Sequence, residues 1–249
     1  SAEGSGDTSF NYPNMFIPVD RAKIVANGVV PADMRNNVDS NIPVNLLKDQ
    51  YITSKDGYTL SSAKAMQLDI ISSMVAQGWK RPAYFAITIP DEYYSFFENQ
   101  DGGYKFTTSA GMAYALTPIN MLAYKSVGSG YTDKAYRNIT EHYRWGGLDK
   151  ATPGNVPYYD ETAARMVNST RISIVEAAQN LIKEAEMAAD LKEHNDSLKV
   201  DVPARVMTDG FIADRYNKAR TLLHLMEQKL PWFAVNASFS IIEDTASAY

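Results

Sequence analysis

Two short segments of the chain place a basic side chain beside an indole ring. Trp79 is followed by Lys80 and Arg81, and Arg144 directly precedes Trp145. An indole face attracts cations and apolar ring surfaces, and a guanidinium pairs with carboxylate or phosphate groups. These side chains are therefore the first candidates for binding an anionic or sugar-bearing group. Their chemistry is that of recognition rather than catalysis.

The residues around Trp79 indicate that a helix ends there and a strand begins. Gly78 takes the left-handed conformation at little cost, and Pro82 prevents a return to helix. Residues 83–89 predict a short buried strand that starts with Ala83 and Tyr84. The junction places the Trp79 group at a sheet edge. There it either grips a ligand or covers the edge while its two cations stay in solvent.

The usual signatures of catalysis are missing from the sequence. There is no cysteine, no glycine-rich phosphate loop ending in Lys-Ser/Thr and no G-x-S-x-G turn. The three histidines lie far apart, without the spacing of metal ligands. The acidic pairs Asp91-Glu92 and Asp160-Glu161 stand at predicted helix starts, where carboxylates act as caps. We therefore expect no catalytic residue, no metal and no cofactor in this chain.

The composition is that of an ordinary globular protein. The chain has 249 residues, of which 45% are hydrophobic and 21% charged, and its formal net charge is -5. This charge argues against nucleic acid as a partner, because nucleic acid rewards basic surfaces. No apolar run reaches the length of a membrane helix. Residues 1–14 begin with small polar residues and are interpreted as a linker or an artificial junction.

Residues 15–130 predict a small sheet with a flanking helix, an α+β or α/β unit. The apolar pieces 15–17 and 24–25 are expected as strands, and a helix over 62–77 precedes the two strand candidates 83–89 and 111–117. A helical turn is expected over 93–97. The face of the helix expected to be buried consists of Ala63, Met66, Ile70 and Met74, with Ile71 and Val75 beside them.

Residues 131–249 predict a helical hairpin region. A helix over 133–144 is followed by a long helix from the cap Asp160 to about residue 192, a polar loop at 194–197 and a second helix over about 209–229. Two helices joined in this way form an antiparallel hairpin, the unit of tetratricopeptide-like solenoids. The second helix is expected to bury Phe211, Ile212, Tyr216, Ala219, Leu222, Leu223 and Met226.

Several segments, taken together in their order and rough spacing, resemble one family over most of residues 15–230. They are Phe16-Ile17-Pro18-Val19-Asp20, Asn27-Gly28, Leu68-Asp69-Ile70, Gly78-Trp79-Lys80-Arg81-Pro82-Ala83-Tyr84-Phe85-Ala86, Gly111-Met112-Ala113-Tyr114-Ala115-Leu116-Thr117-Pro118, Tyr143-Arg144-Trp145-Gly146-Gly147-Leu148-Asp149 and Tyr159-Asp160-Glu161-Thr162. The chain resembles the soluble C-terminal region of a large multi-spanning Bacteroidetes membrane-protein family of unknown function. That family is similar to protein O-mannosyltransferases.

The resemblance implies that this chain is a non-catalytic domain on the periplasmic face of the inner membrane. The membrane-spanning part of the parent chain would use a lipid-linked sugar donor and would be the first partner of this domain. The resemblance also implies tetratricopeptide-type hairpins near the C-terminus. No catalytic residue carries over, because the membrane part is not in this sequence. We expect the domain to bind a protein or glycan acceptor.

Three other functions stay open at this stage. An independent carbohydrate-binding module would use Trp79, Tyr84 and Trp145 as stacking surfaces. A peptide-interaction scaffold would use the groove of the helical hairpin. A hydrolase would require a deep pocket that holds paired carboxylates. Two triplets, Asp196-Ser197-Leu198 and Asp244-Thr245-Ala246, also resemble the acceptor motif of Bacteroidetes O-glycosylation.

Overall fold

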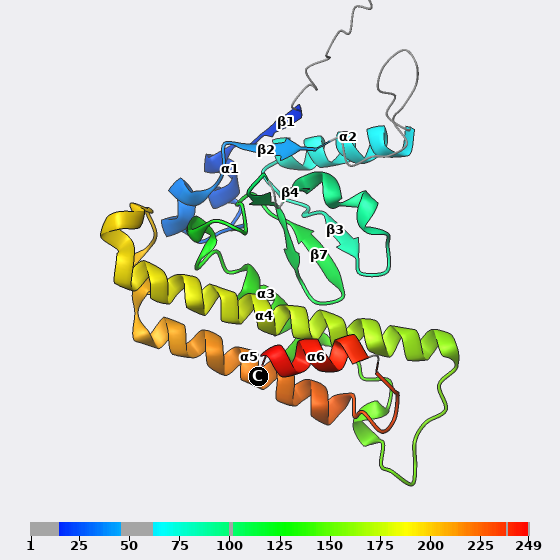
Figure 1. Ribbon diagram of the computed structural model, residues 1–249. Coiled ribbons are helices and arrows are strands. Elements are labelled where there is room, and N and C mark those ends of the chain that lie inside the picture. The colour runs from blue at the N-terminus through cyan, green and yellow to red at the C-terminus, as the bar shows by residue number, and fades with distance from the viewer. Residues whose placement is uncertain (1–14, 46–61, 100–101, 238, 249) are drawn as a thin grey trace, which may run out of the picture.

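The protein is an α+β structure in which an N-terminal unit lies on a long pair of helices (Figure 1). The computed structural model describes residues 15–45, 62–99, 102–237 and 239–248. The fold class expected from the sequence is confirmed, and the antiparallel sheets make it α+β rather than α/β.

The strands form three small antiparallel sheets. β1 (Met15–Pro18) pairs with β2 (Asn41–Val44), β4 (Glu98–Asn99) pairs with β5 (Tyr104–Lys105), and the three-stranded sheet has the order β3 (Tyr84–Ala86), β7 (Ala113–Leu116), β6 (Thr107–Ser109). In the three-stranded sheet Tyr114 of β7 is opposite Phe85 on one side and Ser109 on the other. This register fixes which side chains face the helices.

Two of the expected strands differ from the structure: one is shorter than expected, and the other is a helix. The strand expected over 83–89 is only the three-residue edge strand β3, because a turn closed by the Ile89 N–H and the Ala86 carbonyl follows it. Only Phe85 of β3 is buried. The strand expected at 24–25 is instead helix α1 (Arg21–Ala26), because the Asp20 carboxylate accepts the Ala22 and Lys23 N–H groups in the first turn of that helix.

Helix α2 (Ser62–Ala76) confirms the helix expected over 62–77, but its buried face was partly wrong. Met66 and Ile70 are 65% and 63% exposed, and Ala63 is exposed too. The buried side chains are Lys64, Leu68, Ile71, Met74 and Val75. Apolar residues lie on both sides of this helix, so the periodicity alone does not select the face that packs. Two short 3₁₀ turns, Asp91–Tyr93 and Ser95–Phe97, confirm the helical turn expected at 93–97.

The hydrophobic core is divided between the N-terminal unit and the helices. One cluster takes its buried residues from Ile17 to Tyr131, and the helical cluster begins at Ala135. Helix α3 (Tyr131–Arg137) lies between them and contacts both β6 and the long helix α4. A π-helical turn, Asn138–His142, continues α3 and replaces the last part of the helix expected over 133–144. The domain boundary expected at residue 130 stays a prediction.

The helical hairpin expected from the sequence is present. It consists of α4 (Glu161–Leu198) and α5 (Asp209–Lys229), and α6 (Phe239–Ala248) packs against α4. Asp160 and Thr208 cap the two long helices through their side-chain oxygens. In Figure 1 the hairpin lies beneath the N-terminal unit, with α4 nearer to the sheet. No helix among the described residues is long and apolar enough to span a membrane.

Two details of the hairpin differ from expectation. The loop expected at 194–197 is the last part of α4, which kinks at His194 and ends at Lys199 in the left-handed conformation. The Lys199 N–H donates to the Asn195 carbonyl, so local hydrogen bonds extend the helix through a polar sequence. On α5, Tyr216 is exposed and Arg215 is buried in its place. An ion-pair network holds Arg215, and apolar periodicity does not detect such a network.

Candidate functional site

The residues around Trp79 divide between core and solvent. Trp79 is 2% exposed, and its indole N–H donates to the Leu116 carbonyl of β7 over 3.2 Å. It therefore packs under the sheet and has no open face for a ligand. Lys80 and Arg81 are exposed and make no ion pair within the described ranges, and Tyr84 is exposed on the edge strand. The packing of Trp79 therefore favours a structural role for this residue over ligand binding.

The second candidate pair, Arg144 and Trp145, lies beside the hydrophobic cluster of the helices. Trp145 is half-buried, and its ring centroid is 5.7 Å from that of Tyr143. It packs against the helical cluster, whereas Trp79 belongs to the cluster of the N-terminal unit. Arg144 is exposed. The structure thus does not bring the two indoles to one cleft.

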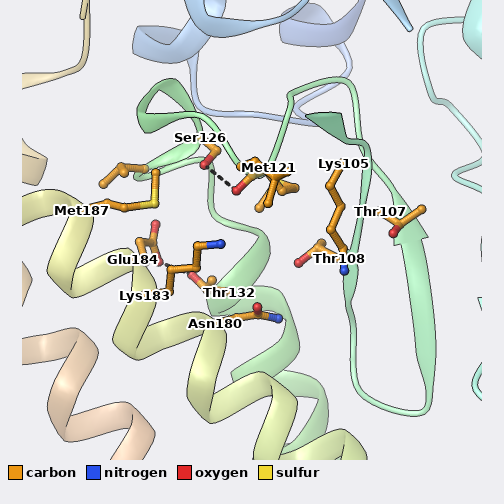
Figure 2. A pocket seen from close by; sticks show the side chains of 12 residues that line it. Lys105, Thr107, Thr108, Met121, Ser126, Thr132, Asn180, Lys183, Glu184 and Met187 are labelled. Carbon is orange, nitrogen blue, oxygen red and sulfur yellow. Dashed lines mark hydrogen bonds between the residues drawn. The ribbon is translucent and has the colours of Figure 1, made fainter. Parts of the chain in front are cut away.

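A polar cleft lies instead between the N-terminal unit and α4. Two cavities of about 420 and 340 Å³ lie there, and a third of about 140 Å³ follows along the same helix between α4 and α6. The first two share Lys105 and Asn180 as lining residues, and the last two share Glu176 and Gln179. We call this continuous depression the interface cleft, and Figure 2 shows its largest cavity.

The middle cavity, the acidic compartment, holds two carboxylates and two tyrosines: Glu98, Glu176, Tyr94 and Tyr114. The Tyr114 hydroxyl is 3.1 Å from both carboxylate oxygens of Glu176 and donates to them. The Thr107 hydroxyl donates to Glu98. The Tyr94 and Tyr114 ring centroids are 5.0 Å apart. These contacts fix the carboxylates from the sheet side while both remain on the cavity wall.

The acidic compartment perturbs the groups that line it. Burial raises the pKa of Glu176, and the nearby Glu98 charge adds to this, while the Tyr114 hydroxyl and Lys105 act against it. Burial also raises the pKa of Tyr114, and the charge of Glu176 adds to that rise. Tyr114 therefore stays protonated and remains a hydrogen-bond donor at neutral pH.

The largest cavity, the basic compartment, is lined on its polar side by Lys105, Thr108, Asn180 and Lys183. In Figure 2 Thr108 turns toward the cavity from β6, and Lys183 and Asn180 project from α4. Lys105 is 3.7 Å from Glu98 and so connects the two compartments. Within the described residues, no three His, Asp or Glu side chains are grouped closely enough to hold a metal ion.

We expect the substitution Glu176→Gln to flatten the pH dependence of stability. A carboxyl whose folded pKa is raised contributes fully below its unfolded pKa, near 4.5, and the contribution is lost as the pH rises through the folded pKa. The free energy of unfolding of wild type relative to E176Q should therefore fall as the pH rises from about 4.5 to 7. Urea denaturation at a series of pH values measures this difference. A difference that is constant with pH, or that rises with it, would contradict the burial of this carboxyl.

The two acceptor-like triplets lie in unequal surroundings. Ser197 is exposed near the end of α4, and its hydroxyl donates to the His194 carbonyl. Thr245 is buried on α6, and its hydroxyl donates to the Ile241 carbonyl. Of the two hydroxyl residues, Ser197 is therefore the accessible one.

The interface cleft could not be predicted from the sequence, because its residues come from α4 and from segments far away in the chain. One signal was available on α4. The polar residues Glu176, Asn180 and Lys183 recur at intervals of four and three residues, so they lie on one face of the helix. Such a polar stripe is compatible with a helix face that lines a polar cavity. The sequence gives no signal for the strands opposite.

The comparisons with known proteins give one match. The profile of the family described as TMEM260-associated domain 2 matches residues 5–136, slightly more than half of the chain. No curated protein and no solved structure matches the chain. The family description links the chain to a membrane glycosyltransferase-like protein. The chain therefore belongs to the TMEM260-associated domain 2 family.

Proposed function

We propose that this chain is a non-catalytic accessory domain of a membrane-embedded glycosyltransferase-like protein, and that it binds the acceptor in the interface cleft. The parent would be related to protein O-mannosyltransferases and would hold this domain on the periplasmic side of the membrane. Its membrane-spanning part would carry the transfer chemistry and use a lipid-linked sugar. The family match supports the link to such a parent.

One observation carries the binding role: several polar side chains that line the cleft make no hydrogen bond or ion pair with the protein groups that the structure describes. The side chains of Gln179, Asn180 and Lys183 have no hydrogen bond or ion pair within the described ranges. Polar groups in a concave, partly enclosed surface are available to a ligand. The same surface lies between two structural units, where binding sites are frequent.

The alternative of a carbohydrate-binding module loses its main stacking surface in this structure. Trp79 is buried under the sheet, and Trp145 packs on a different cluster. Tyr84 alone is exposed among the three aromatic candidates. The interface cleft, rather than these rings, is therefore the better place for a glycan or a peptide to bind.

A second candidate function is hydrolysis of a glycoside, because Glu98 and Glu176 line the same cavity. Paired carboxylates with different surroundings are the basis of acid–base catalysis in such enzymes. Against this role, Tyr114 occupies both oxygens of Glu176, and Thr107 and Lys105 engage Glu98. The accessory role requires no free carboxylate and is therefore preferred.

Two observations test the proposed function. The isolated chain should neither transfer nor hydrolyse sugar when it is incubated with aryl glycosides or with lipid-linked sugars. The coding sequence upstream of Ser1 should encode about ten or more apolar runs of membrane length. Turnover that disappears in Glu176→Gln would instead establish the hydrolase, and an upstream region without apolar runs would refute the membrane parent.

A further inference from the structure

The basic compartment carries a surplus of positive charge. Its charged lining residues are Lys105, Lys183 and Glu184. The Glu184 carboxylate accepts from the Gly128 N–H over 2.7 Å and lies 3.4 Å from the Arg215 Nε. Glu184 thus already has hydrogen-bond and ion-pair partners within the protein, so the two ammonium groups are the charged groups of the lining that are more available to a ligand.

Lys183 is the ammonium group most available to a ligand. It is exposed at the mouth of the cavity, and no ion pair or hydrogen bond of its side chain occurs within the described ranges. The Lys105 ammonium group is 3.7 Å from the Glu98 carboxylate, on the side of the acidic compartment. Figure 2 shows Lys105 reaching from β5 toward α4, from which Lys183 projects. Two cations from opposite walls therefore border one cavity.

A hydroxyl group lies on the same wall. The residue Thr108 is 5% exposed, and its side chain lines the cavity and makes no hydrogen bond with the residues that the structure describes. By contrast, the neighbouring Thr107 hydroxyl is satisfied by Glu98. Thr108 thus offers an unused donor inside the compartment.

The wall also has an apolar part. Met121, Leu122, Val127 and Met187 line the cavity together with the polar groups. A cavity of about 420 Å³ is within the range of small-molecule sites, which combine an apolar lining with a few polar anchors. The compartment therefore suits a molecule, or part of one, that has an apolar body and one charged end.

We propose that the basic compartment binds an oxyanion, a carboxylate or phosphate group attached to an apolar body, through Lys183, Lys105 and the Thr108 hydroxyl. The inference rests on the proposed function, since this compartment belongs to the cleft assigned to the acceptor. It adds the chemical class of the ligand that the cleft binds: a molecule with an acidic group. The donors are ammonium and hydroxyl groups, which form charge-assisted hydrogen bonds with oxyanions.

The test is a titration of the ¹⁵N-labelled chain followed by NMR at the amides of Thr108 and Gly128. The probes are 3-phenylpropanoate, phenyl phosphate and the neutral 3-phenylpropan-1-ol. Both anions should shift these amides, and the alcohol should bind at least about tenfold more weakly, the equivalent of one charge-assisted hydrogen bond. Tighter binding of the carboxylate than of the phosphate, or the reverse, identifies the preferred oxyanion.

Matched variants decide whether the named residues are responsible. Lys183→Met should weaken both anions by about tenfold, and Lys183→Arg should retain most of the affinity. Lys150→Met, which removes an exposed lysine outside the cleft, should have no effect. Thr108→Val should weaken the anions without altering the affinity for the alcohol. Equal binding of anion and alcohol, no amide shift with any probe, or an unchanged affinity in Lys183→Met would each overturn the proposal.

The outcomes also separate this inference from the proposed function. If the anions do not bind but obstruction of the cleft still impairs the parent protein, only the assignment of an oxyanion fails. If the anions bind but obstruction of the cleft leaves the parent unaffected, the compartment stands and the acceptor role fails.

Discussion

Replacing Arg215 with methionine is expected to lower the free energy of unfolding by about 3–5 kcal/mol, the usual cost of breaking a buried ion pair. Arg215 donates to both oxygens of Asp133 over 2.6 and 2.9 Å and lies 3.4 Å from Glu184. Its guanidinium also stacks 4.3 Å from the Phe211 ring centroid. These contacts connect α3, α4 and α5. The substitution leaves Glu184 without its charged partner and leaves Asp133 with Lys218 alone, 2.6 Å away.

Urea denaturation monitored by circular dichroism measures this loss. The double variant Glu184→Gln, Arg215→Met should lose less stability than the sum of the two single variants, because removal of both charges leaves no unpaired ion between them. Arg220→Met, at an exposed position of the same helix, serves as the control and should change stability by less than about 0.5 kcal/mol. A loss in Arg215→Met as small as in the control would show that the network does not hold the helices together.

Replacing Arg171 with methionine is expected to cost about 4 kcal/mol, because several hydrogen bonds of one charged group are lost together. Arg171 is fully buried on α4, and burial lowers its pKa to about 10. It donates to the Leu230, Pro231 and Val235 carbonyls in the segment between α5 and α6, and to the Asn168 side chain. Those carbonyls would lose their partner in the variant.

The loss in Arg171→Met should be concentrated at the C-terminal end of the chain. The guanidinium lies 4.5 Å from the Trp232 ring centroid. It therefore holds the segment that leads from α5 into α6. Hydrogen exchange should therefore show that α6 loses protection while the β3–β7–β6 sheet retains its protection. The variant Arg165→Met, an exposed arginine on the same helix, is the matched control. A uniform loss of protection in Arg171→Met would contradict a local role for this residue.

The elements that follow from local chemistry could be predicted from the sequence. The end of α2 is one case, because Gly78 adopts a positive φ of 67° just after the last helical turn. The caps of α4 and α5 are another, since Asp160 and Thr208 supply the oxygens that the first free N–H groups need. These features depend only on residues near one another in the chain.

The features that depend on distant partners could not be predicted. Arg215 and Arg171 are polar in sequence yet buried, because carboxylates or carbonyls from other segments satisfy them. Met66 and Ile70 are apolar yet exposed, because α2 packs through Leu68 and Ile71 instead. Burial of a polar group is decided by its partners, and partners are a property of the fold.

The candidate site shows the same difference between features that depend on neighbouring residues and features that depend on distant ones. Trp79 was singled out from the sequence for its neighbours, and its actual contact is the Leu116 carbonyl 37 positions later. The interface cleft, in turn, joins Lys105 on β5 to Lys183 on α4, and only the packing of α4 against the sheet brings them to one cavity. The binding role stays a prediction, and the residues that we propose for it differ from those that the sequence analysis singled out.

The most direct test of the account is the kinetics of the full-length parent protein carrying Asn180→Trp. Asn180 lines both compartments and has no hydrogen bond within the described ranges, so the indole should fill the cleft while leaving the fold intact. If the interface cleft binds the acceptor, the KM for the acceptor should rise at least about tenfold while kcat and the KM for the sugar donor stay unchanged, since only acceptor binding is removed. An acceptor KM equal to that of wild type, in a variant of unchanged melting temperature, would contradict the account.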